Sequence, residues 1–142
     1  MVMEFFKKGF KTLKFKNKKP SPFGELEEKV MEIIWNKGNA TVKEVNEQLT
    51  RSGEKYAYTT IMTILDRLYK KGILDRKKEG KGYRYFPKIS KEEFEEMVTE
   101  KVISDIVKAN PSTAVAAFSG IIEELSEEEL KKLKEMIDKK AK

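Results

Sequence analysis

Three amphipathic helical patterns in direct succession restrict the folds open to this chain more than any other feature of the sequence. Apolar residues recur at spacings of three and four in each of them, at residues 25–37, 41–49 and 58–71. The second pattern opens with Thr41 and has Glu44 three residues later, a pair that predicts a capping box. Gly38 and Gly72 follow the first and third patterns, and glycine is a common residue just after a helix.

A β-hairpin pattern follows the third helix at once. The stretch "ILDRKKEGKGYRYFP", residues 73–87, has two runs with β-branched or aromatic residues around a glycine-containing turn at residues 79–82. Pro87 ends the second run, and five of the residues are basic. Three helices followed by a basic two-stranded ribbon is the element order of a winged helix. We therefore expect a mainly α-helical fold with a small β-hairpin wing.

The third helix, "YTTIMTILDRLYKKG", carries three threonines near its start although threonine is a poor helix former. A rotation of 100° per residue brings four apolar side chains to one face, which must be buried: Ile61, Ile64, Leu65 and Leu68. Thr59, Thr63 and Lys70 point nearly the opposite way, with Thr60 and Arg67 on one flank.

Short hydroxyl side chains suit a helix that enters the major groove of DNA. In a helix-turn-helix the first turns of the second helix meet the base edges, where threonine can donate, accept or offer a methyl group to thymine. We expect Thr59, Thr60 and Thr63 to meet bases and Arg67 and Lys70 to meet phosphates. The alternative is that Thr59 is only the helix N-cap.

The hairpin supplies further candidate phosphate ligands. In a winged helix the hairpin lies along the backbone or minor groove, where Lys78, Lys81 and Arg84 can neutralise phosphates. Lys43 and Lys55 complete the predicted DNA-binding set. The alternative is that these charges only keep the turn solvated. Tyr83 and Tyr85 alternate with Arg84, so we expect both rings to pack against the helices.

The distribution of charge agrees with a polyanionic partner. Residues 1–20 carry a net charge of +6, residues 21–88 carry +4 and residues 89–142 carry −4. Within the middle block, residues 51–88 hold 11 basic side chains against 4 acidic ones. We therefore expect residues 51–88 to contact a polyanion and the acidic carboxyl-terminal part to stay outside that contact.

The composition excludes several classes of enzyme. The 142 residues include no cysteine and no histidine, which rules out thiolate metal sites and cysteine or serine–histidine nucleophiles. No pair of carboxylates has a recognisable catalytic context, so we predict neither an enzyme nor a cofactor. Lysine and glutamate dominate and Gln48 is the single glutamine, which predicts a thermophilic source. The sequence shows no membrane span or secretion signal, which predicts a cytoplasmic protein.

Three further helical patterns fill residues 90–142. Ser90 with Glu93 and Ser126 with Glu129 predict capping boxes for the first and last, and Pro111 separates the first from the second. About fifty residues make a thin core alone, so we predict a helical dimerisation domain. The alternative is a monomeric cap folded onto the first domain. The predicted dimer contacts are Phe94, Val98, Ile103, Ile106, Val115, Phe118, Ile122, Leu130, Leu133 and Ile137.

Residues 1–22 form a separate basic arm in this reading, ahead of a DNA-binding domain at residues 23–89. Met3, Phe6, Phe10 and Leu13 recur at helical spacing between lysines, which predicts a cationic amphipathic helix ending near Pro20. Such an arm can be flexible or docked on a partner, can lie on a membrane surface through residues 1–20, or can reach DNA phosphates. The sequence leaves these alternatives open.

Two long stretches, "ELEEKVMEIIWNKGNATVKEVNEQL" and "YAYTTIMTILDRLYKKGILDRKKEGKGYRYFP", resemble the penicillinase-repressor family of winged-helix regulators. The resemblance covers residues 23–90 and includes the tryptophan that closes the first helix, the "ATVKEV" opening of the second and the "KEGKGYRYFP" wing. It implies a homodimer that binds a dyad-symmetric, double-stranded DNA operator and represses the adjacent genes.

The carboxyl half resembles the family in kind and departs from it in detail. In the β-lactam-responsive members a membrane-bound sensor protease triggers cleavage of an Asn–Phe bond, whereas here Ala117 precedes Phe118. The copper-responsive members use paired cysteines, which this chain lacks. A sensor protease therefore remains an open partner, and thiolate metal sensing is excluded.

The sequence thus supports two hypotheses of different classes. The first is a dimeric, sequence-specific transcriptional regulator that represses genes from a palindromic operator. The alternative is a winged-helix adaptor that acts through protein or membrane-surface contacts of its amino-terminal arm.

Overall fold

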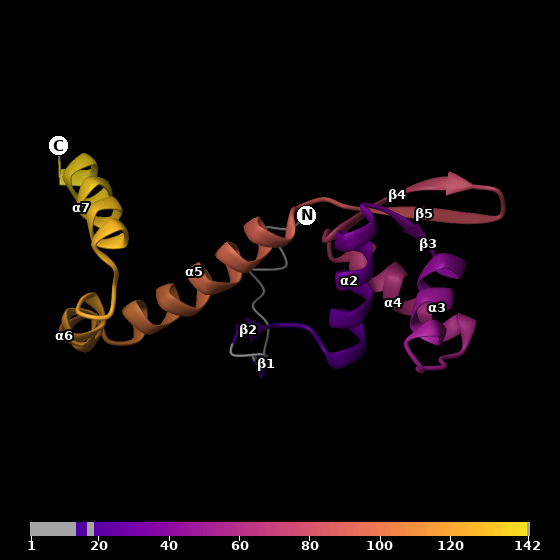
Figure 1. Ribbon diagram of the computed structural model, residues 1–142, viewed down its shortest axis with the longest axis horizontal. Coiled ribbons are helices and arrows are strands. Elements are labelled where there is room, and N and C mark those ends of the chain that lie inside the picture. Colours follow the sequence, from indigo (N-terminus) through magenta and orange to yellow (C-terminus); the bar gives the residue numbers. More distant parts are fainter. Residues whose placement is uncertain (1–13, 17–18, 142) are drawn as a thin grey trace. The chain divides into compact units, whose positions relative to one another are not determined.

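The computed structural model describes residues 14–16 and 19–141 and divides the chain into two compact units, Met1–Glu100 and Lys101–Lys142. Eight elements lie wholly in the first unit (Figure 1), namely β1 (Lys14–Lys16), β2 (Lys19–Ser21), α2 (Glu25–Lys37), β3 (Ala40–Thr41), α3 (Val42–Arg51), α4 (Tyr58–Lys70), β4 (Leu74–Glu79) and β5 (Gly82–Pro87). The chain continues into α5 (Lys91–Ala109), α6 (Pro111–Ile122) and α7 (Glu127–Ala141). No helix among the described residues is long and apolar enough to cross a membrane.

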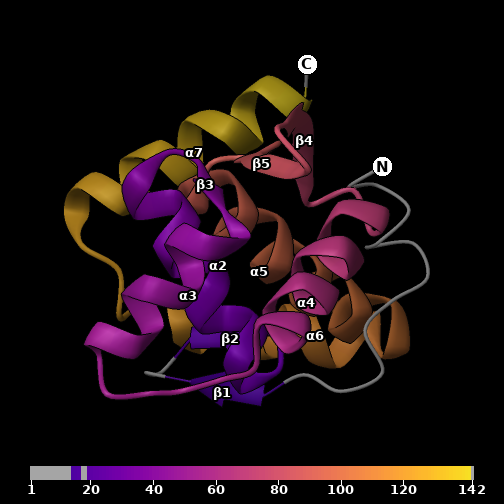
Figure 2. The same ribbon diagram turned by 90° about the vertical axis from the view of Figure 1, so that its right-hand side faces the viewer.

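The three predicted helices of the first unit are confirmed, with their predicted caps. Gly38 ends α2 with a left-handed φ of 88°, a conformation that glycine adopts without a steric penalty. At the start of α3 the N–H of Glu44 donates to Thr41 Oγ1 at 3.2 Å, and the N–H of Thr41 donates to Glu44 Oε1 at 3.4 Å. α3 lies against both α2 and α4, as the two views in Figures 1 and 2 show.

The predicted hairpin is confirmed and gains a third strand. β4 and β5 pair antiparallel from Leu74 opposite Pro87 to Glu79 opposite Gly82. The short strand β3 pairs with the other edge of β5, so the sheet order is β3-β5-β4. Sequence patterns missed β3 because two residues between two helices are too short to show alternation.

The segment before α2 differs from the prediction. Residues 14–16 and 19–21 are two short antiparallel strands, paired from Lys14 opposite Ser21, rather than the end of an amphipathic helix. The "KFK" stretch has the period of a strand, and a residue before proline is disfavoured in helical conformation. The earlier part of the predicted helix, residues 1–13, lies outside the described residues.

The core of the first unit joins all three helices to the sheet. Its buried side chains include Val30, Met31 and Ile34 of α2 and the four predicted apolar residues of α4. Tyr85 is buried and Tyr83 packs against the core, as expected.

The start of α5 belongs to this same core, which corrects two predicted dimer contacts. Phe94 stacks on Phe23 with ring centroids 4.9 Å apart and also contacts Trp35, while Val98 is buried beside them. Trp35 Nε1 donates to the carbonyl of Ile89 at 3.0 Å. The periodicity of the sequence predicts that Phe94 and Val98 lie on one apolar face of a helix. It does not predict which surface covers that face. The compact unit that contains the winged helix continues to Glu100, whereas the predicted boundary of the DNA-binding domain at residue 89 stays a prediction.

The second unit contains the rest of α5 with α6 and α7. The predicted box of Ser126 and Glu129 is present, with bonds of 2.9 and 3.2 Å, and Asn110 Oδ1 caps α6 by accepting the N–H of Thr113. No residue of α6 or α7, both described in full, is buried. The side chains of Ile106 and Val115 are 57% and 70% exposed.

Candidate nucleic-acid interface

The exposed face of α4 carries the predicted threonines. Thr59, Thr60, Thr63, Arg67 and Lys70 are all exposed, on the helix that buries its apolar side in the core. The N-cap of α4 is Ala57, so Thr59 lies in the first turn and the alternative reading of Thr59 as the cap is wrong. The first turns of α4 thus present hydroxyl groups to solvent.

The hydroxyl of Thr63 has a defined orientation. Thr63 Oγ1 donates to the carbonyl of Thr59 at 2.8 Å, one helical turn earlier. Because its hydrogen is used in this bond, the oxygen faces a ligand as an acceptor, and the methyl group lies beside it. Thr63 can accept from a base amino group or contact a thymine methyl.

Two large apolar side chains share this surface. Tyr58 is 50% exposed and Met62 is 44% exposed, one turn apart on α4. Periodicity alone cannot tell whether a neighbouring element covers Met62.

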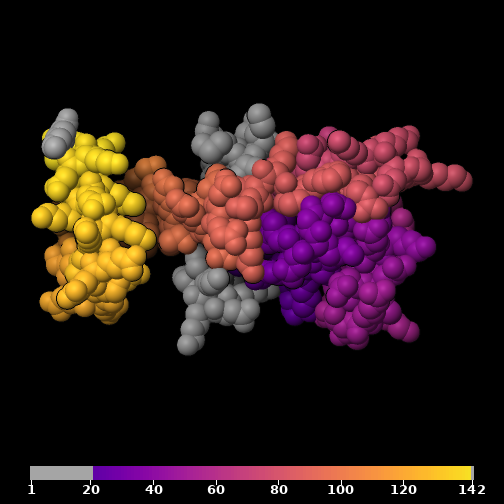
Figure 3. Space-filling view, turned by 45° about the horizontal axis from the view of Figure 1, so that its top comes forward, coloured from indigo at the N-terminus to yellow at the C-terminus, as the bar shows by residue number. Residues whose placement is uncertain are grey.

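Several lysines of the wing and of the region around α3 make no ion pair within the part of the chain that the structure describes. Gly80 takes a left-handed φ of 60° in the turn between β4 and β5, next to the exposed Lys78 and Lys81. The space-filling view shows the hairpin end extending past the helices of the first unit (Figure 3). The exposed basic side chains that make no ion pair with any described residue include Lys43, Lys55, Arg67, Lys78 and Lys81.

Arg76, by contrast, is tied into the protein. Its guanidinium lies 3.9 Å from the ring centroid of Tyr69 and 4.0 Å from that of Tyr83, a cation–π arrangement with each ring. Arg76 Nη1 also donates to Asp66 Oδ1 at 3.0 Å. Bonds from Lys70 and then Arg76 hold the pKa of Asp66 below its usual value of 3.8. These contacts fasten the hairpin to α4.

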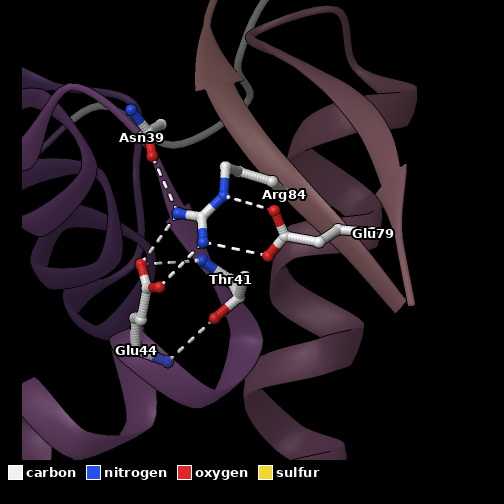
Figure 4. A network of polar contacts seen from close by, with 5 residues as sticks. All are labelled: Asn39, Thr41, Glu44, Glu79 and Arg84. Atoms are coloured by element: carbon white, nitrogen blue, oxygen red, sulfur yellow. Dashed lines mark hydrogen bonds and ion pairs between the residues drawn. The ribbon is translucent and has the colours of Figure 1, made fainter. Parts of the chain in front are cut away.

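Arg84 is held by three side chains (Figure 4), a group that we call the Arg84 clamp. Nη1 and Nη2 donate to the two carboxylate oxygens of Glu44 at 3.0 and 2.9 Å. Nε and Nη2 donate to the two oxygens of Glu79 at 3.0 and 2.9 Å, and Nη1 donates to Asn39 Oδ1 at 2.8 Å. The sequence predicted a phosphate contact for Arg84, because a sequence pattern does not show that Glu44, Glu79 and Asn39 lie within hydrogen-bond distance of it.

The clamp sets the electrostatics at the start of α3. The Arg84 guanidinium, helped by the N–H of Thr41, holds the pKa of Glu44 below its usual value of 4.5. Bonds to Glu44 and then Glu79 raise the pKa of Arg84. Glu47 lines the same open groove as Glu44 and Glu79 but makes no bond in the clamp. No cluster of acidic side chains suited to a metal ion occurs in the described part of the chain.

Comparison with known proteins identifies the relatives of this fold. The family model of the penicillinase repressor matches residues 23–139, which include parts of both units. The chain belongs to the penicillinase repressor family. This membership confirms the resemblance found in the sequence, and the family is one of repressors rather than enzymes.

Individual members of the penicillinase repressor family match most of the length of this chain. The methicillin resistance regulatory protein MecI of Staphylococcus aureus (strain N315) is 31% identical over 111 residues, which cover 78% of this chain and 89% of that protein. The penicillinase repressor of Bacillus licheniformis is 28% identical over 121 residues, covering 85% and 93%. The solved DNA-binding domain of the repressor BlaI is 31% identical with a TM-score of 0.44, covering 56% of this chain and 90% of that chain.

Proposed function

We propose that this chain is a DNA-binding transcriptional repressor that acts as a homodimer on a palindromic operator. The observation that carries the proposal is the exposed, threonine-bearing face of α4 beside the free lysines of the wing, on a winged helix of the penicillinase repressor family. An exposed helix face with short polar side chains suits the major groove, and unpaired lysines suit phosphates.

The proposed roles follow exposure and bonding. Thr59, Thr60 and Thr63 read base edges, with Thr63 acting as an acceptor. The phosphate contacts come from the exposed basic side chains Lys43, Lys55, Arg67, Lys70, Lys78 and Lys81. Lys70 lies 2.9 Å from Asp66, so part of its charge is compensated within α4.

The homodimer is proposed from the surface of the second unit. Its apolar side chains Ile103, Ile106, Val115, Phe118 and Ile137 are exposed in the single chain, and Ile122, Leu130 and Leu133 are half-buried. Exposed apolar surface of this kind is covered when two copies pair about a two-fold axis. Two copies would present two α4 helices to successive major grooves, which requires a palindromic operator.

The experiment that tests this function is selection of bound fragments from a random DNA pool by the full chain. We expect a palindrome whose half-sites lie about one helical turn apart, roughly 10 base pairs. The affinity should fall steeply with salt, with a log–log slope of roughly −6 to −10 for a dimer that contacts about that many phosphates. Selection of no sequence, or an affinity that does not change with salt, would contradict the proposal.

The location of the protein, its source and its further partners are also part of this proposal. Operator binding requires access to DNA, which supports a cytoplasmic location, and the lysine- and glutamate-rich composition supports a thermophilic source. Contact of residues 1–20 with a membrane surface rests on their net charge of +6, and liposome flotation with and without these residues tests it. Incubation with a candidate sensor protease and mass spectrometry of the fragments tests whether cleavage relieves repression.

A further inference from the structure

Arg84 is a basic residue of the wing with no donor left for DNA. An arginine side chain carries five N–H groups, and the Arg84 clamp uses five hydrogen bonds, two to Glu44, two to Glu79 and one to Asn39. We propose that Arg84 is a positioning residue that fixes the direction of the wing so that Lys78 and Lys81 reach DNA phosphates. This inference rests on the proposed function and adds to it a residue that acts without touching DNA.

The clamp joins segments that are otherwise weakly connected at this point. Asn39 precedes β3, Glu44 lies in the first turn of α3, Glu79 ends β4 and Arg84 lies in β5. β3 pairs with β5 only at Tyr85 and Arg84, so the outer part of the hairpin, residues 78–83, has no third strand beside it. An isolated two-stranded hairpin is only marginally stable in water. The direction of the wing end therefore depends on side chains at its base.

Glu44 couples the clamp to a helix. Its carboxylate accepts both from Arg84 and from the N–H of Thr41, while its own N–H donates to Thr41 Oγ1. The side chain that closes the capping box of α3 is thus the same one that holds the wing (Figure 4). A change of Arg84 is transmitted to the start of α3 and to the end of β4 together.

The clamp also compensates charge near the proposed phosphate contacts. Glu79 precedes the turn that carries Lys81, and a carboxylate there would repel a phosphate if it were unpaired. Arginine is specifically required because its planar fork can bind two carboxylates side by side, whereas the lysine ammonium has three donors and no fork. Lysine at residue 84 would keep the charge and lose the geometry.

This difference gives the first test, which compares the full-length chain with its Arg84→Lys and Arg84→Gln variants on the selected operator. If Arg84 only positions the wing, both variants should bind about tenfold more weakly than the wild type. If Arg84 contacts a phosphate, Arg84→Lys should stay close to the wild type and only Arg84→Gln should be weak. Wild-type affinity of Arg84→Lys would overturn the proposal.

A double-mutant cycle with Lys81→Ala supplies a readout that a purely structural role would not move. Lys81→Ala should weaken binding by the wild type and should have little further effect in the Arg84→Lys variant, because the wing no longer delivers Lys81 to the backbone. Amide hydrogen exchange at residues 78–83 should become faster, and the base preference read by α4 should be unchanged. Full additivity of the two substitutions would contradict the proposal.

Glu79→Gln tests the clamp from its acidic side, with Glu47→Gln as a matched control. Both remove one negative charge from the same groove, which alone strengthens DNA binding, but only Glu79 belongs to the clamp. We expect Glu79→Gln to weaken binding relative to Glu47→Gln, and equal effects would count against the clamp. If the wild type itself bound no sequence, the proposed function would fail, and this inference with it. If the wild type bound and Arg84→Lys bound equally well, only the inference would fail.

Discussion

The two units of this chain solve the burial of apolar side chains in different ways. The first unit encloses its own core, in which side chains such as Leu65 and Val98 are essentially inaccessible to water. The second unit leaves Ile106 and Val115 more than half exposed. A unit with its own core can fold as an independent body, whereas a unit without one needs a partner surface. The comparison separates a unit that encloses its own core, which carries the proposed DNA-binding face, from a unit whose exposed apolar surface we propose is covered by a second copy.

The largest expected effect comes from charging the exposed apolar surface of the second unit. Ile106→Glu should cost about 2 kcal/mol per copy, and roughly 4 kcal/mol in a symmetric dimer that contains two copies. Sedimentation should then show the 16.5 kDa monomer where the wild type shows a dimer. Lys108→Glu, on the same helix, is the matched control and should leave the mass unchanged. If the wild type itself were a monomer, the proposal that a second copy covers the apolar surface of the second unit would be wrong.

The next largest effect is expected from a substitution in the core of the first unit, and it tests whether this core provides the stability of the unit. Leu65→Ala should lower the free energy of unfolding by about 3 kcal/mol, because it leaves a cavity in a fully buried site. Urea unfolding followed by circular dichroism measures the loss. Met62→Ala, three residues earlier on the exposed side of α4, is the control and should change the free energy of unfolding very little. Equal losses for the two variants would show that the core is not where the stability lies.

The same contrast between the units explains what the sequence could and could not predict. Helix positions, capping boxes and the hairpin were predictable because each depends on residues close together in the chain, such as Thr41 with Glu44 and Ser126 with Glu129. The surface that covers Phe94 was not predictable, because it includes Phe23, which is far away in the sequence. The short strands β1, β2 and β3 were missed because none of them is long enough to show a pattern.

The candidate site divides in the same way. Exposure of the α4 threonines followed from helical rotation alone, because one face had to be apolar and buried. The roles of Arg76 and Arg84 did not follow, because a count of basic residues cannot show which of them already has a carboxylate or an aromatic partner. The described structure separates basic side chains without an ion pair, such as Lys81 and Arg67, from Arg76 and Arg84, which hold the hairpin in place.

A smaller effect concerns base recognition by the first unit. Thr63→Val keeps the shape and a methyl group but removes the acceptor, while Thr63→Ser keeps the acceptor and removes the methyl. If Thr63 accepts from a base amino group, Thr63→Val should reduce discrimination at one operator position by about 2 kcal/mol and Thr63→Ser should not. Competition binding with single-base operator variants measures this. The reverse order would assign recognition to the methyl group instead.

The smallest effect compares the capping carboxylates of the two units. Bonds with Arg84 and Thr41 lower the pKa of Glu44, whereas bonds with Ser126, followed by the charge of Lys132, lower that of Glu129. A lowered pKa in the folded state stabilises the protein above the unfolded value of 4.5, and this stabilisation is lost as the pH falls through the lowered value.

Titration of the side-chain carboxyl carbons by NMR measures both groups in one experiment. Arg84→Lys should bring the pKa of Glu44 closer to its usual value, because the paired bonds of the guanidinium fork are lost, while the pKa of Glu129 stays where it was. In urea unfolding, Glu44→Gln should flatten the decline of stability in acid. An unchanged pKa of Glu44 in the Arg84→Lys variant would mean that the capping box of α3, like that of α7, needs no help from the wing.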